Sequence, residues 1–139
     1  MNEINKGNVA RYCKPSSLGE DGCPTSSAFQ RRPNRNEGYL SVYLLEFFKN
    51  KNTDEKENVA EVKKEMEKHS NFDLKKNGLF AVINIEQSKD YILREIQKLI
   101  YYRELRLPHC GIFHDHDDLV ISELLVECIQ SQYKIKDIE

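Results

Sequence analysis

Apolar and polar positions divide the chain into short extended segments followed by longer helical ones. In the first fifty residues, β-branched and aromatic side chains alternate with turn-forming ones. The pattern predicts strands at 8–13, 26–31 and 39–43, with prolines and glycines marking the turns between them. Residues 44–48 either continue the third strand or begin a short helix, and their periodicity fits both.

The middle of the chain alternates between a helical and a buried extended pattern. Thr53 or Asp54 is placed to cap a helix that runs to about His69, with a narrow apolar stripe along a charged surface. Residues 79–85 are apolar on both faces, which is typical of a central strand covered on each side. Ser88 is predicted to cap a second helix, and residues 103–107 to be extended.

The last helix has the clearest pattern. Asp117 or Asp118 precedes apolar residues at positions i, i+3, i+4 and i+7, so we expect a helix near 118–131. Residues 1–7 and 133–139 are polar and are expected to fray. Since strands come first and helices later, the sequence predicts one α+β domain over residues 1–139, with one mixed β-sheet and about three helices.

Composition narrows the class of protein. The 139 residues include 21 Lys and Arg against 23 Asp and Glu, a net charge of −2, which argues against generic nucleic-acid binding. No apolar run approaches the ~18 residues that span a bilayer, and the polar start does not resemble a signal peptide. The four cysteines are too few for a secreted disulfide scaffold. We therefore expect a cytoplasmic protein without membrane association.

The densest group of potential metal ligands lies between residues 109 and 118. It contains imidazole, thiol and carboxylate groups, which bind transition metals. One hypothesis is a zinc or other divalent metal site formed by His109, His114, His116 and Asp115. However, no spacing matches a known zinc motif, so the alternative is a polar loop whose aspartates cap the last helix, without any cofactor. Acid–base catalysis by a histidine is a third possibility.

Arginines and one carboxylate form the second group of candidates. Guanidinium groups bind phosphate or carboxylate through paired hydrogen bonds, so four arginines near the first turns are candidate anion ligands: Arg11, Arg31, Arg32 and Arg35. Glu46 lies within an apolar run, where a buried and paired carboxylate would be a catalytic candidate with His109. We predict that Arg11, Glu46 and His109 share one cleft. The alternative is that Arg11 and Glu46 form only a salt bridge between strands.

Several short sequence words resemble those of a family of small uncharacterised bacterial proteins. The words are Val9-Ala-Arg-Tyr12, Ala28-Phe29, Tyr39-Leu-Ser-Val42 with Glu46, Phe80-Ala-Val82 and His109-Cys-Gly-Ile112. The resemblance covers most of the chain and implies no activity. It implies that the polar residues within these words, Arg11, Ser41, Glu46 and His109, are the family's shared polar positions.

These observations favour a binding function over catalysis. The sequence has no glycine-rich phosphate loop, nucleophile elbow or Rossmann fingerprint, and its aromatic and arginine residues are of the types enriched at interfaces. We expect an accessory protein of a bacterial multi-component system that binds a protein partner, a second copy of itself or an anionic ligand. The alternative is a small metal-dependent hydrolase or nuclease that uses the 109–118 segment.

Overall fold

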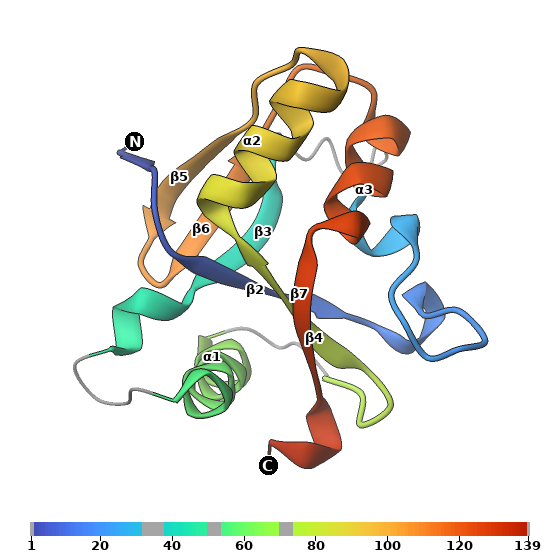
Figure 1. Ribbon diagram of the computed structural model, residues 1–139. Coiled ribbons are helices and arrows are strands. Elements are labelled where there is room, and N and C mark those ends of the chain that lie inside the picture. The colour runs from blue at the N-terminus through green and yellow to red at the C-terminus, as the bar shows by residue number, and fades with distance from the viewer. Residues whose placement is uncertain (1, 32–37, 50–53, 70–73, 139) are drawn as a thin grey trace.

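Seven antiparallel strands form one sheet in the order β1-β5-β6-β3-β2-β4-β7 within the described part of the computed structural model (Figure 1). The structure describes residues 2–31, 38–49, 54–69 and 74–138. The strands are β1 (Glu3–Ile4), β2 (Asn8–Cys13), β3 (Leu40–Leu44), β4 (Leu79–Asn84), β5 (Tyr101–Arg106), β6 (His109–Phe113) and β7 (Ile129–Lys134). The α-helices are α1 (Glu55–His69), α2 (Ile85–Ile96) and α3 (Asp118–Glu127). Four short 3₁₀ helices are η1 (Pro15–Ser17), η2 (Ser26–Phe29), η4 (Leu45–Phe48) and η5 (Ile135–Asp137).

The predicted α+β class with about three helices is confirmed, but the sheet is antiparallel rather than mixed. Every strand pairing among the described residues is antiparallel. The chain between β3 and β4 contains α1, a connection that would suit a parallel pair. However, β2 lies between these two strands and pairs with both, so β3 and β4 never become neighbours. The insertion of β2 between β3 and β4 therefore makes the sheet antiparallel at this point.

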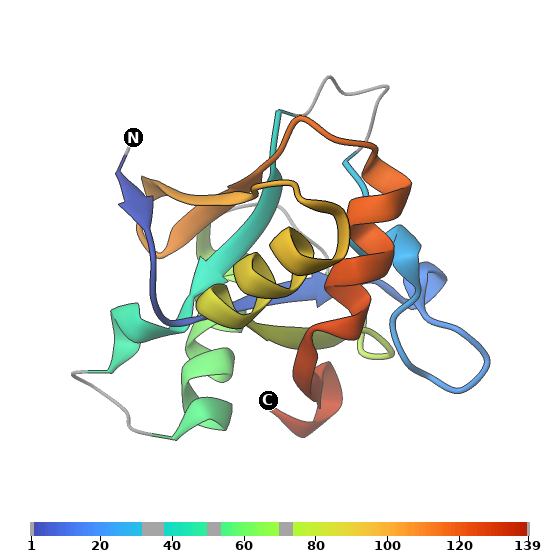
Figure 2. The ribbon, with the colours of Figure 1, turned by 45° about the horizontal axis from the view of Figure 1, so that its top comes forward.

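Helices α2 and α3 lie on one side of the sheet, which we call the α2/α3 face (Figures 1 and 2). Ile85 and Ile92 of α2 and Ile121 and Leu125 of α3 pack against Val42 and other strand residues in the larger hydrophobic cluster. These side chains are fully buried. Burying a branched aliphatic side chain contributes about 1.5–3 kcal/mol, so this layer contains the main stabilising core.

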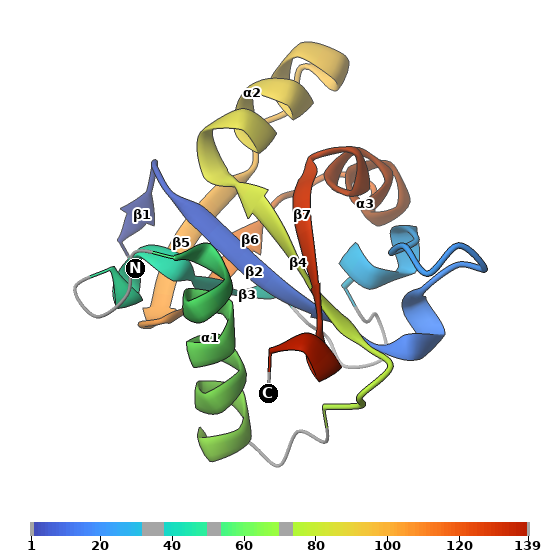
Figure 3. The same cartoon turned by 60° about the horizontal axis from the view of Figure 1, so that its bottom comes forward.

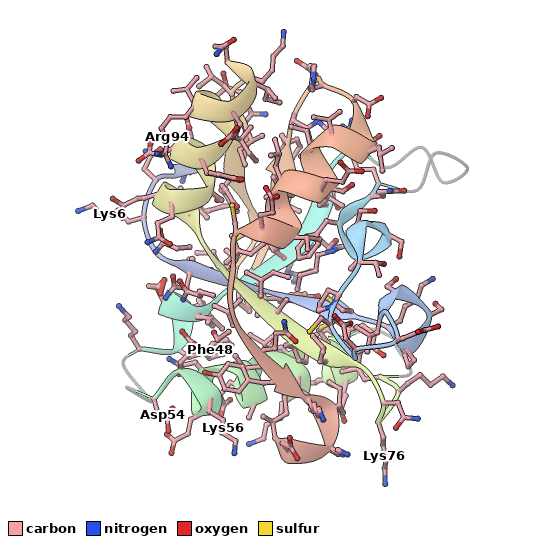
Figure 4. All side chains as sticks on the ribbon, turned by 45° about the vertical axis from the view of Figure 1, so that its right-hand side comes forward. Lys6, Phe48, Asp54, Lys56, Lys76 and Arg94 are labelled. Atoms are coloured by element: carbon pink, nitrogen blue, oxygen red, sulfur yellow. The ribbon has the colours of Figure 1, made fainter. Side chains whose placement is uncertain are left out.

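Helix α1 lies on the opposite side, which we call the α1 face (Figure 3). Its apolar stripe, Val59, Val62 and Met66, packs on Phe80 in the second hydrophobic cluster. Phe48 of η4 points toward α1 and belongs to the same cluster (Figure 4). The two faces together bury β4 on both sides, as its uninterrupted apolar pattern predicts.

Three predicted features need correction. Residues 26–29 form the 3₁₀ helix η2 rather than a strand, and η2 packs against α3. Helix α2 begins at Ile85, because Asn84 caps it by accepting a hydrogen bond from the Gln87 N–H. Ser88 is instead buried inside the helix, where its hydroxyl contacts Tyr102 Oη at 2.6 Å and the Ile85 carbonyl.

The predicted starts and ends of the helices agree with the structure only in part. Asp117 caps α3 by accepting from the Val120 N–H, and α1 ends at His69. Of the 44–48 segment, Leu44 ends β3 and residues 45–48 form the 3₁₀ helix η4. The last helix is shorter than predicted, because α3 ends at Glu127 rather than near 131 and Ile129–Lys134 form β7. The ends that were expected to fray differ as well, since they include β1 and the last residues of β7.

Candidate functional site

The strands β3, β6 and β5 present a polar and aromatic surface on the α1 face. Side chains alternate along a strand, and Leu40 and Val42 of β3 belong to the cluster on the α2/α3 face. Ser41 therefore points the other way, and its side chain is exposed. The described part of α1 packs over β2 and β4 instead, through residues such as Val62. We call this region the β3–β6–β5 surface, formed by Tyr39, Ser41, Tyr43, Tyr101, Arg103, Arg106, His109 and Phe113.

His109 lies at the centre of the β3–β6–β5 surface. Its Nε2 is 3.0 Å from Ser41 Oγ, within hydrogen-bond distance. The imidazole stacks on the ring of Tyr43, with centroids 5.2 Å apart and 24° between the planes, and meets the edge of Tyr39 at 6.1 Å. Tyr43 is directly opposite His109 in the register of β3 and β6. The imidazole is thus held in one orientation by three neighbours.

Gly111 allows two aromatic rings to lie flat over the sheet. A Cβ atom at this position would come within 2.9 Å of both Tyr39 Cδ2 and Phe113 Cε1. Tyr39 and Phe113 themselves contact each other, with centroids 5.3 Å apart. A glycine inside a strand often marks such a close approach. Any larger residue would displace the rings that border His109.

Two arginines on β5 give this surface its positive charge. The Arg103 guanidinium lies 4.9 Å from the ring centroids of both Tyr101 and Phe113, a cation–π arrangement that restrains it. Arg106 is exposed and lies opposite His109 in the register of β5 and β6. Residues directly opposite in an antiparallel pair share a face. The two guanidinium groups and the imidazole therefore belong to one surface.

Burial shifts the pKa values of two side chains on this surface, His109 and Tyr43. It lowers the pKa of His109 below its ordinary value of 6.5, so the imidazole is neutral at pH 7. Burial also raises the pKa of Tyr43, with the charges of Glu65 and Tyr39 as smaller causes. A neutral His109 can accept a proton from a ligand or donate a hydrogen bond to it, while the arginines remain charged.

Arg11 lies on the other face of the sheet. Its Nε donates to the Ala28 carbonyl, its Nη1 donates to the Ser41 carbonyl at 2.7 Å, and its guanidinium lies 5.8 Å from the Phe29 ring. Phe29 is part of the core on the α2/α3 face. Arg11 thus ties η2 and β3 to β2. Arg11 and His109 contact the same residue, Ser41, but from opposite sides.

Glu46 holds the start of β2. Its carboxylate accepts two hydrogen bonds from the Asn8 N–H, at 2.7 Å to Oε2 and 3.1 Å to Oε1. Gly7 has φ +113°, and a Cβ there would lie 2.1 Å from Glu46 Oε2. Glu46 binds the Asn8 amide, whereas Arg11 and His109 lie on opposite faces of the sheet, so the single cleft predicted for these three residues is not formed.

Arg31 and His114 meet Asp118 at the start of α3. Arg31 Nε donates to Asp118 Oδ1 at 2.7 Å, and its Nη1 donates to the His114 carbonyl at 3.0 Å. The buried His114 ring accepts from the His116 N–H at Nδ1, and its Nε2 lies 3.3 Å from Asp118 Oδ1. Burial and the Arg31 charge lower the pKa of His114. This cluster fastens the segment before residue 32 to α3.

The sheet separates His109 from the other three residues considered as metal ligands, His114, Asp115 and His116, which follow one another after β6. Cys110 and Ile112 of β6 belong to the core on the α2/α3 face, so the alternation of β6 places His109 on the α1 face. His114 follows β6 and contacts Asp118 of α3, on the α2/α3 face. Asp115 is exposed, and His116 contacts the His114 ring through its backbone. Among the residues that the structure describes, no group of three His, Cys, Asp or Glu side chains is placed to hold a metal ion.

Two of the predicted anion ligands, Arg32 and Arg35, lie outside the described residues.

Some residues of the β3–β6–β5 surface were not predicted from the sequence, although the alternation of side chains along two strands could have indicated them. Arg103, Arg106 and Phe113 were not singled out, although Arg103 and Phe113 alternate with core residues as surface positions of a hairpin should. The hairpin itself was obscured, because residues 109–113 were interpreted as part of a polar loop.

Comparison with protein-family models, curated protein sequences and solved structures gives no match for this chain. None of the described helices is both long enough and apolar enough to cross a membrane. The functional argument therefore depends on the geometry of the site.

Proposed function

We propose that the chain is a small cytoplasmic binding protein, an accessory component of a bacterial multi-component system, whose β3–β6–β5 surface binds an anionic group. The group is a carboxylate or phosphate, carried by a protein partner or a small ligand. The observation that supports this most directly is the placement of Arg103 and Arg106 on the same surface as the hydrogen-bonded pair His109 and Ser41.

The chemistry of these side chains suits anion binding. A guanidinium offers paired donors that match the oxygens of carboxylate and phosphate. Arg103 is restrained by Tyr101 and Phe113, so less side-chain entropy is lost when it binds. Ser41 and His109 supply uncharged hydrogen-bonding groups beside the two cations. The half-buried aromatic rings around them provide apolar contact with a partner.

The state of the cysteines supports the proposed cytoplasmic location. All four are free thiols: Cys13, Cys23, Cys110 and Cys128. Burial raises the pKa of Cys13 to about 11 and that of Cys110 to about 12, so both remain protonated and unreactive at neutral pH. Free thiols are the normal state in a reducing compartment.

Binding can be tested with inorganic phosphate and with acetate, followed by NMR of the ¹⁵N-labelled protein. We expect saturable shifts of the amides of Ser41 and Gly111 and of the His109 ring. Arg103→Gln should weaken binding about tenfold, equivalent to about 1.4 kcal/mol. Arg94→Gln is the matched control, because Arg94 is an exposed arginine on α2 (Figure 4). Unsaturable shifts over the whole surface, or equal weakening by both substitutions, would contradict the proposal.

A further inference from the structure

Strand β7 is the last strand of the sheet, with β4 as its one strand neighbour among the described residues. In Figure 3, β7 and β4 lie side by side, and β7 is the outer of the two. Gln130, Gln132 and Lys134 of this edge strand are exposed. Such an edge commonly carries proline or charged residues that prevent pairing with another chain. β7 has no proline, and its one charged residue, Lys134, is at its end.

The outward peptide groups of β7 can be identified from its register. The Ile135 N–H donates to the Gly78 carbonyl, so the peptide groups of Ile135 point toward β4. Hydrogen-bonding direction alternates along an antiparallel strand. The N–H and C=O groups of Lys134 and Gln132 therefore point away from β4. They form a row of donors and acceptors along the outer edge.

This row is complementary to itself. In an antiparallel pair centred on Gln132, the Gln132 N–H and C=O of one copy meet the same groups of the other copy. Gln130 of each copy then lies opposite Lys134 of the other. The side chains of each opposing pair point to the same face of the sheet. The α2/α3 face of one copy therefore continues into the α2/α3 face of the other.

Charges at the two ends of β7 favour the same arrangement. A hollow of about 710 Å³ lies beside the start of β7. Its charged lining residues are Asp90, Glu127 and Arg94, so its net charge is negative, and the exposed Leu93 also lines it. The other end of β7 leads to η5, where Lys136 and Asp137 are exposed, and with the exposed Lys134 this end has a net positive charge. Antiparallel pairing brings η5 of one copy beside the hollow of the other. Lys136 would then face the two carboxylates, and Leu93 would be covered.

We propose that this protein forms a two-fold symmetric dimer in which the outer edges of β7 from two copies pair, with Gln132 at the axis. The interface is independent of the β3–β6–β5 surface. Pairing of two edge strands covers a small area, so a micromolar dimer is expected. The dimer extends the sheet of each copy across the axis.

Sedimentation equilibrium of the full chain over a range of concentrations tests this proposal. Gln132→Pro removes the outward N–H at the axis without removing a bond to β4, and should weaken dimerisation at least about tenfold, one decade in the dissociation constant. Gln132→Ala keeps the N–H and is the matched control, which should dimerise like the parent. A parent chain that remains monomeric at high micromolar concentration would overturn the proposal.

Two measurements remain informative if Gln132→Pro unfolds. Hydrogen exchange of the Gln132 amide in the parent should slow as the protein concentration rises, whereas a concentration-independent rate overturns edge pairing. Lys136→Glu should weaken the dimer, and adding Asp90→Lys should restore it. Absence of both effects, with a dimer still present, would show that the copies associate through another surface.

Discussion

Arg11 and His109 reach the same residue, Ser41, from opposite faces of the sheet. Arg11 Nη1 donates to the Ser41 carbonyl at 2.7 Å, while His109 Nε2 lies 3.0 Å from Ser41 Oγ. One contact fixes the backbone of β3, and the other uses the side chain that this backbone presents. The orientation of Ser41 toward the β3–β6–β5 surface is therefore supported by a half-buried cation on the other face of the sheet.

Replacing Arg11 should reduce stability. Arg11→Lys loses the planar pair of donors that reaches both Ala28 and Ser41, and hydrogen bonds from a charged group contribute about 1.5–3 kcal/mol. We expect a loss of about 1–3 kcal/mol in the free energy of unfolding, measured in urea. Arg94→Lys on α2 is the control and should change it by less than about 0.5 kcal/mol. Equal small effects would show that the Arg11 contacts are weak.

Gly7 should tolerate substitution less well than Gly22. Both have positive φ, +113° and +81°, but a Cβ at Gly7 meets the Glu46 carboxylate, whereas a Cβ at Gly22 meets nothing within 4 Å. Gly22→Ala therefore measures backbone strain alone, about 1–2 kcal/mol. Gly7→Ala should cost about 1–3 kcal/mol more, because Glu46 must move from the Asn8 amide. Thermal unfolding of the two variants compares them, and similar losses would contradict the role of Glu46.

His114 and His109 should make the protein less stable in acid. Burial lowers the pKa of both in the folded state, so the unfolded chain binds protons first as the pH falls below about 6.5. Stability should decrease from that pH downward until the folded-state pKa values are passed. Protonated His114 also carries an N–H at Nδ1, which opposes the His116 N–H. The double variant His109→Gln/His114→Gln should show a flatter decrease in urea unfolding between pH 7.5 and pH 5, and an unchanged slope would refute this assignment.

His109→Gln should separate binding from stability. Glutamine retains a hydrogen-bonding group near Ser41 but lacks the ring that stacks on Tyr43. Anion binding should weaken, while the free energy of unfolding changes by no more than about 1 kcal/mol, because the site is partly exposed. Calorimetric titration and urea unfolding of the same sample measure both. A larger loss of stability with unchanged binding would make His109 a packing residue.

The protein purified without an affinity tag should contain far less than stoichiometric zinc, iron, manganese or nickel. His109 and His114 lie on opposite faces of the sheet, and tight metal sites need several ligands converging on one point. Elemental analysis gives the answer directly. A full equivalent of one of these metals would revive the hydrolase hypothesis for the 109–118 segment.

Local sequence signals predicted the individual helices and strands better than they predicted which segments contact one another. The cap at Asp117 and the apolar stripe of α1 are encoded within a few residues, and both elements form as expected. Ser88 is of a residue type that caps helices, but Asn84 lies at the point where β4 ends. Its side-chain oxygen Oδ1 accepts the hydrogen bond from the Gln87 N–H, so the helix begins after Asn84. Tertiary context thus decided between two capable residues.

The candidate site was only partly foreseeable for a related reason. His109 and Arg11 were singled out for their chemistry, yet their separation by the sheet depends on the registers of β2 with β3 and of β3 with β6. No pattern within either segment contains that register. Arg103 joins the site through a hairpin whose second strand was interpreted as a loop. Side-chain type therefore indicated candidates, and pairing between distant segments decided which of them act together.

The order of strands also determines how the chain must fold. Among the described pairings, β5–β6 is the one hairpin, while Ile4 pairs with Tyr102 and Val42 with Cys110. Closing long loops costs entropy before the new contacts stabilise anything. Domains dominated by such non-local pairings fold in milliseconds to seconds rather than microseconds. During that time β4, which is apolar on both faces, has one edge that β7 has not yet covered. The folding chain is therefore most vulnerable to aggregation along β4.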